Sequence, residues 1–301
     1  MKAIFITISF CLILFTSCHR GAVPASTPVV NTETKTATGQ PMLLGHCSVA
    51  ELNREPYSKW YSASFSNYKT DSNTIAQLGS ALKGKTIEVF LGTWCGDSQR
   101  EVPRLVKILQ QAHFDTANLK LIFVDNTPGK YKQSPQHEEQ GLFIFRVPTI
   151  VIYGKSEMGR IVESPVVSLE KDLLTILQKQ PYTPNYKAGN YWHKEVARKS
   201  KPMSDAELQS LAVTMKPMTR AMGEINSLGY LVLYQKDYTQ ALNIFKLNTF
   251  MYPDNAGTYD SLAEGYAVSG DKEKAKYYYQ KVLAMKPGDE NATKQLGLLN
   301  K

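Results

Sequence analysis

A 34-residue period in the last third of the chain is the feature that most restricts how this sequence can fold. Leu228, Leu262 and Leu296 follow one another at this interval. The same interval separates the small residues Gly229, Ala263 and Gly297, and the pairs Ala241 and Ala275, Phe245 and Tyr279, and Pro253 and Pro287. Small residues let paired helices approach closely, an aromatic ring fills the groove between them, and proline ends the second helix. The period therefore predicts stacked helix pairs.

This pattern resembles the tetratricopeptide (TPR) repeat family. The resemblance implies an all-α helical-repeat module over residues 225–301, with residues 291–300 as a single capping helix, that binds a partner protein or peptide. A packing appendage that only stabilises the preceding domain is the alternative. We interpret residues 183–224 as a connector and a helix, because Ser204 and Glu207 form a capping-box pattern that opens a purely helical region.

Strands alternate with helices between residues 44 and 182. Buried strands are predicted from apolar, β-branched and aromatic runs at residues 85–91, 119–124 and 149–153, with a fourth at 160–162. Helices are predicted from the apolar spacing at residues 72–82, 99–111 and 168–178. This alternation predicts an α/β domain with a central sheet flanked by helices.

The first residues have the pattern of an export signal. Lys2 precedes an apolar run over residues 3–15, which is too short for a comfortable membrane span, and Thr16-Ser17-Cys18 follows. The position of this cysteine resembles a bacterial lipobox, which implies removal of residues 1–17 as a lipoprotein signal peptide and a lipid on Cys18. An uncleaved anchor is the alternative. Both predict a membrane-anchored protein of the cell envelope that faces the periplasm, with residues 18–43 as a flexible tether.

Charge and histidine placement argue against several classes of partner. The formal net charge is +8, but basic residues alternate with acidic ones, and only residues 194–201 form a basic run. No nucleic-acid recognition motif accompanies them, so we do not expect nucleic-acid binding. The five histidines do not pair at ligand spacings, so we expect neither a metal nor a cofactor.

The chemical motif of the chain is Thr-Trp-Cys-Gly-Asp-Ser at residues 93–98, where a predicted strand ends and a helix begins. Cys95 would face unsatisfied backbone N–H groups and the positive end of the helix dipole, and both favour the thiolate, the form that attacks disulfides. Trp94 would supply an apolar platform beside the sulfur. Asp97 suits the dipole but opposes thiolate formation. A structural thiol without chemistry is the alternative for Cys95.

The motif resembles the Trp-Cys-Gly-x-Cys sequence of the thioredoxin family, with Ser98 in place of the second cysteine. Pro103 matches the helix-kinking proline, and Val147-Pro148-Thr149 matches the cis-proline loop that lies against the active-site sulfur. Gly154 and residues 159–162 continue the pattern as a last hairpin, and residues 161–165 look like a Bacteroidetes-type exported branch. The resemblance implies a thioredoxin-like fold that acts on protein or peptide thiols and disulfides. Its implied site is Cys95, Ser98 and Pro148, surrounded by Trp94, Gly96, Asp97, Val147 and Thr149.

Two departures from the family restrict the function. Ser98 cannot release a mixed disulfide, so release needs an external thiol, a substrate cysteine or Cys47, which is otherwise an incidental cysteine. Val89 stands where many thioredoxins carry a buried acid, and Glu88 should point to the opposite face of its strand. We therefore expect no efficient dithiol reductase. Two functions stay open: thiol–disulfide exchange or isomerisation through one cysteine, and a redox-inactive interaction module.

Overall fold

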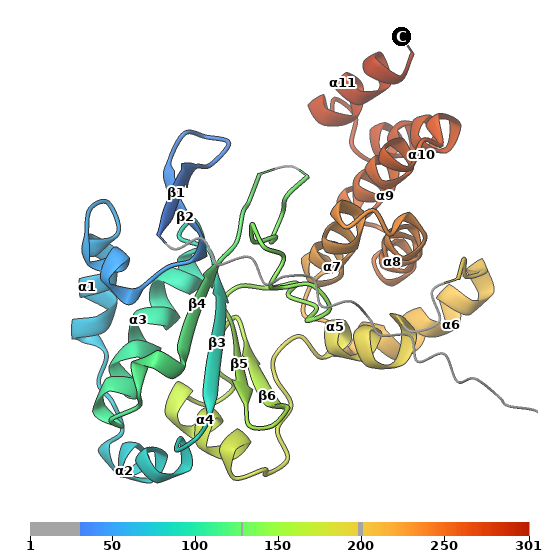
Figure 1. Ribbon diagram of the computed structural model, residues 1–301. Helices are drawn as coiled ribbons and strands as arrows, with labels where there is room; N and C mark the ends of the chain where they lie inside the picture. Colours follow the sequence, from blue (N-terminus) through green and yellow to red (C-terminus); the bar gives the residue numbers. More distant parts are fainter. Residues whose placement is uncertain (1–30, 128, 198–200, 301) are drawn as a thin grey trace, which may run out of the picture.

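The computed structural model describes residues 31–127, 129–197 and 201–300. Its N-terminal half is built around a mixed six-stranded sheet, and its C-terminal half is all-helical (Figure 1). The strands are β1 Thr32–Lys35, β2 Pro41–His46, β3 Thr86–Leu91, β4 Leu119–Phe123, β5 Thr149–Tyr153 and β6 Glu157–Val162, in the sheet order β1-β2-β4-β3-β5-β6. Among these six described strands, only β3 and β4 pair in parallel.

Side chains of β3 alternate between two cores because successive residues of a strand point to opposite faces of the sheet. Ile87, Val89 and Leu91 join the larger core, whose helices are α1 Ser58–Asn67, α2 Ser72–Ala81, α3 Gly96–Gln111 and α4 Leu169–Leu177. Glu88 lies on the other face, where its Oε1 is 2.9 Å from Lys120 Nζ. The predicted orientations of Val89 and Glu88 are therefore confirmed.

The second face of the sheet carries a smaller core. Phe90, Val124 and Val151 pack there with Ile144 and Val147 from the segment that joins β4 to β5. The described residues of this segment, 124–127 and 129–148, form no helix. We predicted helices flanking the sheet, but this face is covered by irregular chain whose apolar side chains do the packing.

The prediction of a flexible tether over residues 18–43 is wrong for the part that the structure describes. β1 and β2 form an antiparallel hairpin, and β2 also pairs with β4. Met42 and Leu43 are both fully buried, and Leu43 belongs to the larger core of the α/β half. The rest of the predicted tether, with the predicted signal segment and Cys18, lies outside the described residues.

The C-terminal half follows the 34-residue period. Its helices are α7 Met222–Tyr234, α8 Tyr238–Met251, α9 Ala256–Ser269, α10 Lys272–Met285 and α11 Glu290–Leu299, so α7, α9 and α11 begin 34 residues apart, as do α8 and α10. The short elements η1 Val49–Asn53, η2 Thr116–Asn118 and η5 Lys216–Met218 lie elsewhere in the chain. Among the periodic positions, Leu228, Leu262, Ala241, Ala275 and Phe245 are fully buried.

Gly229 shows why the period needs small residues. A Cβ at this position would lie 2.4 Å from Cε1 of Phe245, which is closer than real Cβ contacts. The ring of Phe245 thus occupies the space that a side chain on α7 would need. The repeat pairs a small residue on one helix with an aromatic ring on the next.

The described residues between the two halves are packed rather than loose. Helix α5 Lys187–Tyr191 runs into the π-turn η3 Trp192–Val196, and α6 Asp205–Met215 packs on α8. Trp192 is 1 % exposed and shares a core cluster with Phe145 and Val162 of the α/β half and with Leu228 of α7. One hydrophobic core therefore spans both halves. The predicted capping box is present, since the side chains of Ser204 and Glu207 each bond the other residue's backbone N–H.

Candidate functional site

Cys95 occupies the junction that the sequence predicted. It is the N-cap residue of α3, with φ −99° and ψ 121°, and its side chain is partly exposed. Its backbone N–H donates to the carbonyl oxygen of Gly92 at 3.0 Å, and its own carbonyl oxygen accepts from the N–H of Gln99 at 3.0 Å. The sulfur therefore sits at the end of a 16-residue helix whose first N–H groups lack intrahelical partners.

The loop that carries Pro148 lies against this sulfur. Cys95 Sγ donates a hydrogen bond to the carbonyl oxygen of Val147 at 3.2 Å, and the Val147–Pro148 peptide bond is cis. Two bonds fix the loop on either side. The hydroxyl of Thr149 donates to the carbonyl of Arg146 at 2.7 Å, and the N–H of Glu163 donates to the carbonyl of Pro148 at 2.7 Å.

Ser98 lies one turn into α3 and is only 1 % exposed. Its Oγ accepts a hydrogen bond from the backbone N–H of Gly92 at 3.3 Å, so it ties the loop after β3 to the helix. Asp97 is paired with the Arg100 guanidinium at 2.6 Å, so a cation faces the carboxylate of the motif. Gly96 is exposed, and a Cβ there would meet nothing within 4 Å.

The Trp94 indole is held by a hydrogen bond and lies against Gly92. Its Nε1 donates to the carbonyl of Val124 at 2.9 Å. A Cβ at Gly92 would lie 2.4 Å from Trp94 Cε2, so only glycine at position 92 leaves room for the ring. The Trp94 and Tyr131 rings lie 6.4 Å apart, and Tyr131 in turn lies 6.4 Å from Tyr234 of α7. The aromatic surface beside Cys95 therefore continues onto the first repeat helix.

The structure brings a further set of residues to this loop that sequence reasoning missed. Lys132 is 3 % exposed, and its Nζ donates to the carbonyl of Phe145 and to Tyr131 Oη, both at 2.7 Å. Burial lowers the pKa of Lys132 to about 7. Arg146 and Glu163 form an ion pair at 3.4 Å, and burial raises the pKa of Glu163. Nothing in the polar Lys-Tyr-Lys sequence at residues 130–132 signals a buried amine.

Arg146 also connects the loop to the helices. Its Nη2 donates to the carbonyl of Gly223 at 2.9 Å, and its guanidinium lies 4.6 Å from the centre of the Tyr186 ring. Gln133 Nε2 donates to the carbonyl of Tyr234 at 3.3 Å. The β4–β5 segment is thus bonded at two points to α7, the first helix of the repeats.

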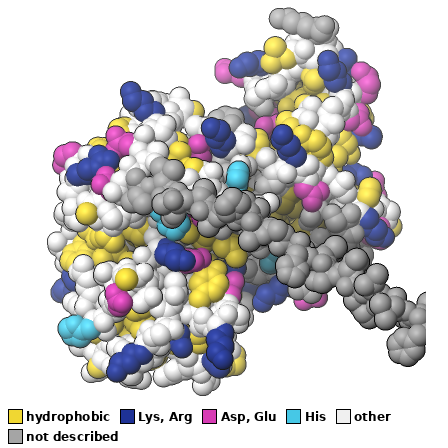
Figure 2. All heavy atoms as spheres, in the orientation of Figure 1, with side chains coloured by type: hydrophobic (Ala, Val, Ile, Leu, Met, Phe, Trp, Pro, Cys, Tyr) yellow, Lys and Arg dark blue, Asp and Glu magenta, His cyan; other side chains and the backbone are white. Residues whose placement is uncertain are grey.

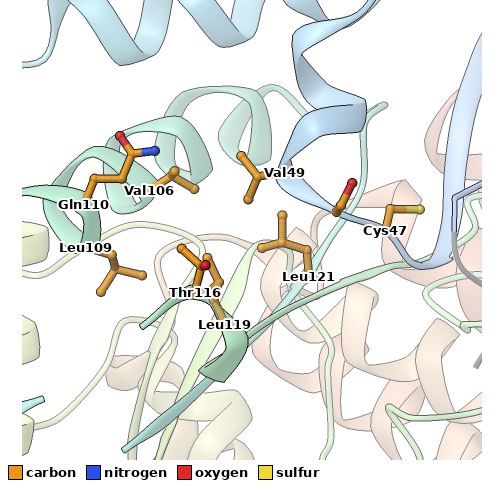
Figure 3. A pocket seen from close by; sticks show the side chains of 9 residues that line it. Cys47, Val49, Val106, Leu109, Gln110, Thr116, Leu119 and Leu121 are labelled. Atoms are coloured by element: carbon orange, nitrogen blue, oxygen red, sulfur yellow. The ribbon is translucent and has the colours of Figure 1, made fainter. Parts of the chain in front are cut away.

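Cys47 lies in a different environment. It is 5 % exposed, it belongs to the core shared with α1 to α4, and its Sγ donates to the carbonyl of Leu44 at 3.6 Å. Burial raises the pKa of its thiol to about 11. A pocket of about 320 Å³ between α3 and β4 has Cys47 at its edge, and Figure 3 shows the sulfur pointing away from the other lining side chains. Both cysteines are free. The structure does not bring Cys47 to Cys95.

The parts of the chain that the structure describes contain neither a candidate metal site nor a candidate membrane-spanning helix. Within them, no three His, Cys, Asp or Glu side chains gather closely enough to hold a metal ion. No helix there is both long and apolar enough to cross a membrane. On the face seen in Figure 2, acidic and basic side chains are interspersed over both halves.

The structure therefore defines a two-part protein: a mixed-sheet α/β domain with a partly exposed thiol at a helix N-terminus, followed by helices of 34-residue period. No protein-family model matches the chain, and no curated protein sequence matches it.

Proposed function

We propose that this chain is an exported, lipid-anchored member of the thioredoxin family that carries out thiol–disulfide exchange through Cys95 alone. The observation that carries the proposal is the geometry of that sulfur. It is partly exposed, lies at the N-terminus of α3 and contacts the loop of Val147 and Pro148 at 3.2 Å. A thiol at a helix N-terminus that solvent can reach is the arrangement that makes a cysteine reactive.

The exchange step needs no cofactor. The Cys95 sulfur attacks one sulfur of a substrate disulfide, a new S–S bond forms as the substrate bond breaks, and the leaving sulfur takes the electron pair and a proton. The mixed disulfide is then released by a second thiol. Ser98 has no thiol, and the raised pKa and burial of Cys47 leave it almost without thiolate at neutral pH. The second thiol therefore belongs to the substrate, which gives isomerisation, or to a small-molecule thiol, which gives net reduction.

We propose that the C-terminal helices are TPR repeats that bind the partner protein. Supporting this proposal, the helices recur every 34 residues, and Gly229 and Phe245 form the small-to-aromatic packing that such pairs need. The aromatic contacts from Trp94 through Tyr131 to Tyr234 give a substrate a continuous surface between the repeats and the sulfur.

Mixed-disulfide trapping in the native envelope tests the enzymatic part. The wild-type chain and the Cys47→Ala variant should both form mixed disulfides with envelope proteins, and Cys95→Ala should form none. Partners that persist with Cys95→Ala, or the absence of any trapped partner with wild type, would reject thiol–disulfide exchange.

A redox-inactive interaction module is the second candidate, and one contact favours it. The Cys95 thiol donates its proton to a carbonyl oxygen, a partner that a thiolate would lose. Affinity capture separates the two candidates: an interaction module recovers the same non-covalent partners from the wild type and from Cys95→Ala.

A further inference from the structure

A run of aromatic rings leads from the reactive sulfur onto the first repeat helix. Trp94, the residue before Cys95, lies 6.4 Å from Tyr131, and Tyr131 lies 6.4 Å from Tyr234 of α7. Tyr234 stacks on Tyr230, which lies one turn earlier in α7, with 6.0 Å between the ring centres. All four rings are partly exposed. They therefore offer a surface on which an extended polypeptide can lie.

This aromatic run ends at two partly exposed carboxylates of α9. Tyr230 Oη donates to Glu264 Oε2 at 2.6 Å, and Asp260 lies one turn before Glu264 in the same helix. Residues four apart share one face of a helix, so the exposed Val268, one turn after Glu264, continues the row. The equivalent position to Glu264 in the next repeat helix is the exposed Leu298. The far end of the run is therefore acidic, and the surface beyond it is apolar.

These two carboxylates have neutral partners. Among the residues that the structure describes, no Lys, Arg or His side chain lies within ion-pair distance of Asp260 or Glu264. Asp260 accepts from the side-chain amide of Asn291 at 2.8 Å, whereas Lys286 pairs with Asp289. Burial raises the pKa of both carboxyl groups, and the charge on Asp260 adds to the rise at Glu264. A positive charge brought by another molecule would stabilise both carboxylates.

We propose that the substrate of Cys95 is a polypeptide segment with a lysine or arginine near its reacting cysteine, and that Glu264 and Asp260 bind this basic side chain. The proposal rests on the function proposed above and names its substrate class. A cation fits this end of the surface for two reasons: the carboxylates pair with it, and the faces of the tyrosine rings attract it. The chain as a whole has a formal net charge of +8, so the attraction of a basic segment is local to this surface.

The length of the aromatic run limits the spacing in the substrate. Successive ring centres from Trp94 to Tyr230 lie 6.4, 6.4 and 6.0 Å apart. An extended chain advances about 3.3 Å per residue, so roughly six residues cover the rings and at most about eight reach from the sulfur to Glu264. The basic residue should therefore lie within about eight residues of the reacting cysteine.

Binding of thiol-free peptides to the full chain tests this recognition apart from any redox step. Two fluorescent peptides carry serine in place of cysteine and differ only in having lysine or glutamate about six residues on either side of it. Fluorescence anisotropy gives both Kd values. Wild type should bind the lysine peptide roughly tenfold more tightly, although its net charge favours the glutamate peptide. Equal affinities, or tighter binding of the glutamate peptide, would overturn the proposal.

Isosteric variants locate the preference for lysine. Glu264→Gln keeps an oxygen for Tyr230 Oη, and Asp260→Asn keeps one for Asn291, so the double variant loses two charges and no hydrogen-bond acceptor. Urea unfolding checks that it is folded. The double variant should bind the two peptides equally. Glu290→Gln is the matched control, because it removes an exposed carboxylate of α11, and it should keep the preference of wild type. A folded double variant that keeps the preference would overturn the proposal.

The failure of this inference and the failure of the proposed function are distinguishable. The comparison of the two peptides on wild type needs no variant, and neither peptide has a thiol that could react with Cys95. Absence of trapped disulfide partners would reject thiol–disulfide exchange at Cys95. Equal peptide affinities on a chain that does trap partners would reject only the recognition of a basic residue by Glu264 and Asp260.

Discussion

The N-terminus of α3 and the turn after β2 each hold one free cysteine, and they differ in almost every property that controls a thiol. Cys95 is partly exposed, caps a long helix and touches an irregular loop. Cys47 is buried against α1 to α4, and its pKa is raised to about 11. The comparison teaches that reactivity here depends on the place of the sulfur in the fold, since the two side chains are chemically identical.

The largest expected difference between the two regions is in labelling rate. At pH 7 a thiol with a pKa of about 11 is ionised in only about one molecule in 10⁴, so Cys47 should react roughly 100-fold more slowly than a free cysteine. Cys95 should label faster than Cys47 by at least that factor. Time-resolved mass spectrometry of the two peptides measures both rates in one sample. Equal rates would break the comparison.

A second prediction concerns the seat of Trp94. Gly92→Ala places a Cβ against the indole ring, so the ring must move and lose its bond to Val124, at a cost of about 1–3 kcal/mol in the free energy of unfolding. Gly96→Ala is the control, because its Cβ meets nothing within 4 Å. Urea unfolding measures the stability of both variants. The region of Cys47 should be unaffected, so slow labelling of Cys47 should persist.

The third prediction is a pH dependence with a definite sign. The pKa of Lys132 is about 7 in the folded protein, compared with 10.5 for an ordinary lysine, the value expected in the unfolded chain. Between these two pH values the unfolded chain therefore binds more protons than the folded protein does. Stability from this group therefore rises with pH across that window. Between pH 7 and pH 9 the free energy of unfolding of wild type should increase by about 2 kcal/mol relative to Lys132→Met. Urea unfolding at the two pH values checks this, and parallel curves would contradict it.

The smallest effect is expected at Cys47, with the opposite sign. Its pKa is raised in the folded protein, so the folded state keeps its proton longer and loses stability as the pH rises above 9.0. This loss should amount to less than about 1 kcal/mol at pH 9.5, and Cys47→Ala should remove it. The measurement is the difference in unfolding free energy between pH 8 and pH 9.5. If the variant lost more unfolding free energy than wild type between these pH values, the prediction for Cys47 would be wrong.

Local patterns predicted the parts of the fold that local interactions determine. The strands at β3, β4 and β5, the helix after Cys95 and the 34-residue helix pairs were all readable from apolar spacing. The hairpin of β1 and β2 was not, because its segment is rich in Thr and polar residues and its pairing with β4 runs through the backbone of Gly45 and His46. Lys132 was missed for a related reason: its burial depends on Phe145 and Tyr131, which only the tertiary structure brings to it.

The core that spans both halves also determines what can be cut from this molecule. Phe145 and Val162 bury their side chains with Trp192 and the helices, and Gly189 leaves only enough space for the Phe145 ring. Separate expression of the residues before and after position 183 would expose, on each fragment, apolar side chains that are buried in the intact protein. The two halves therefore cannot be exchanged as independent domains. Joining the repeats to another protein would require the connecting segment and, on that protein, an apolar surface that fits it.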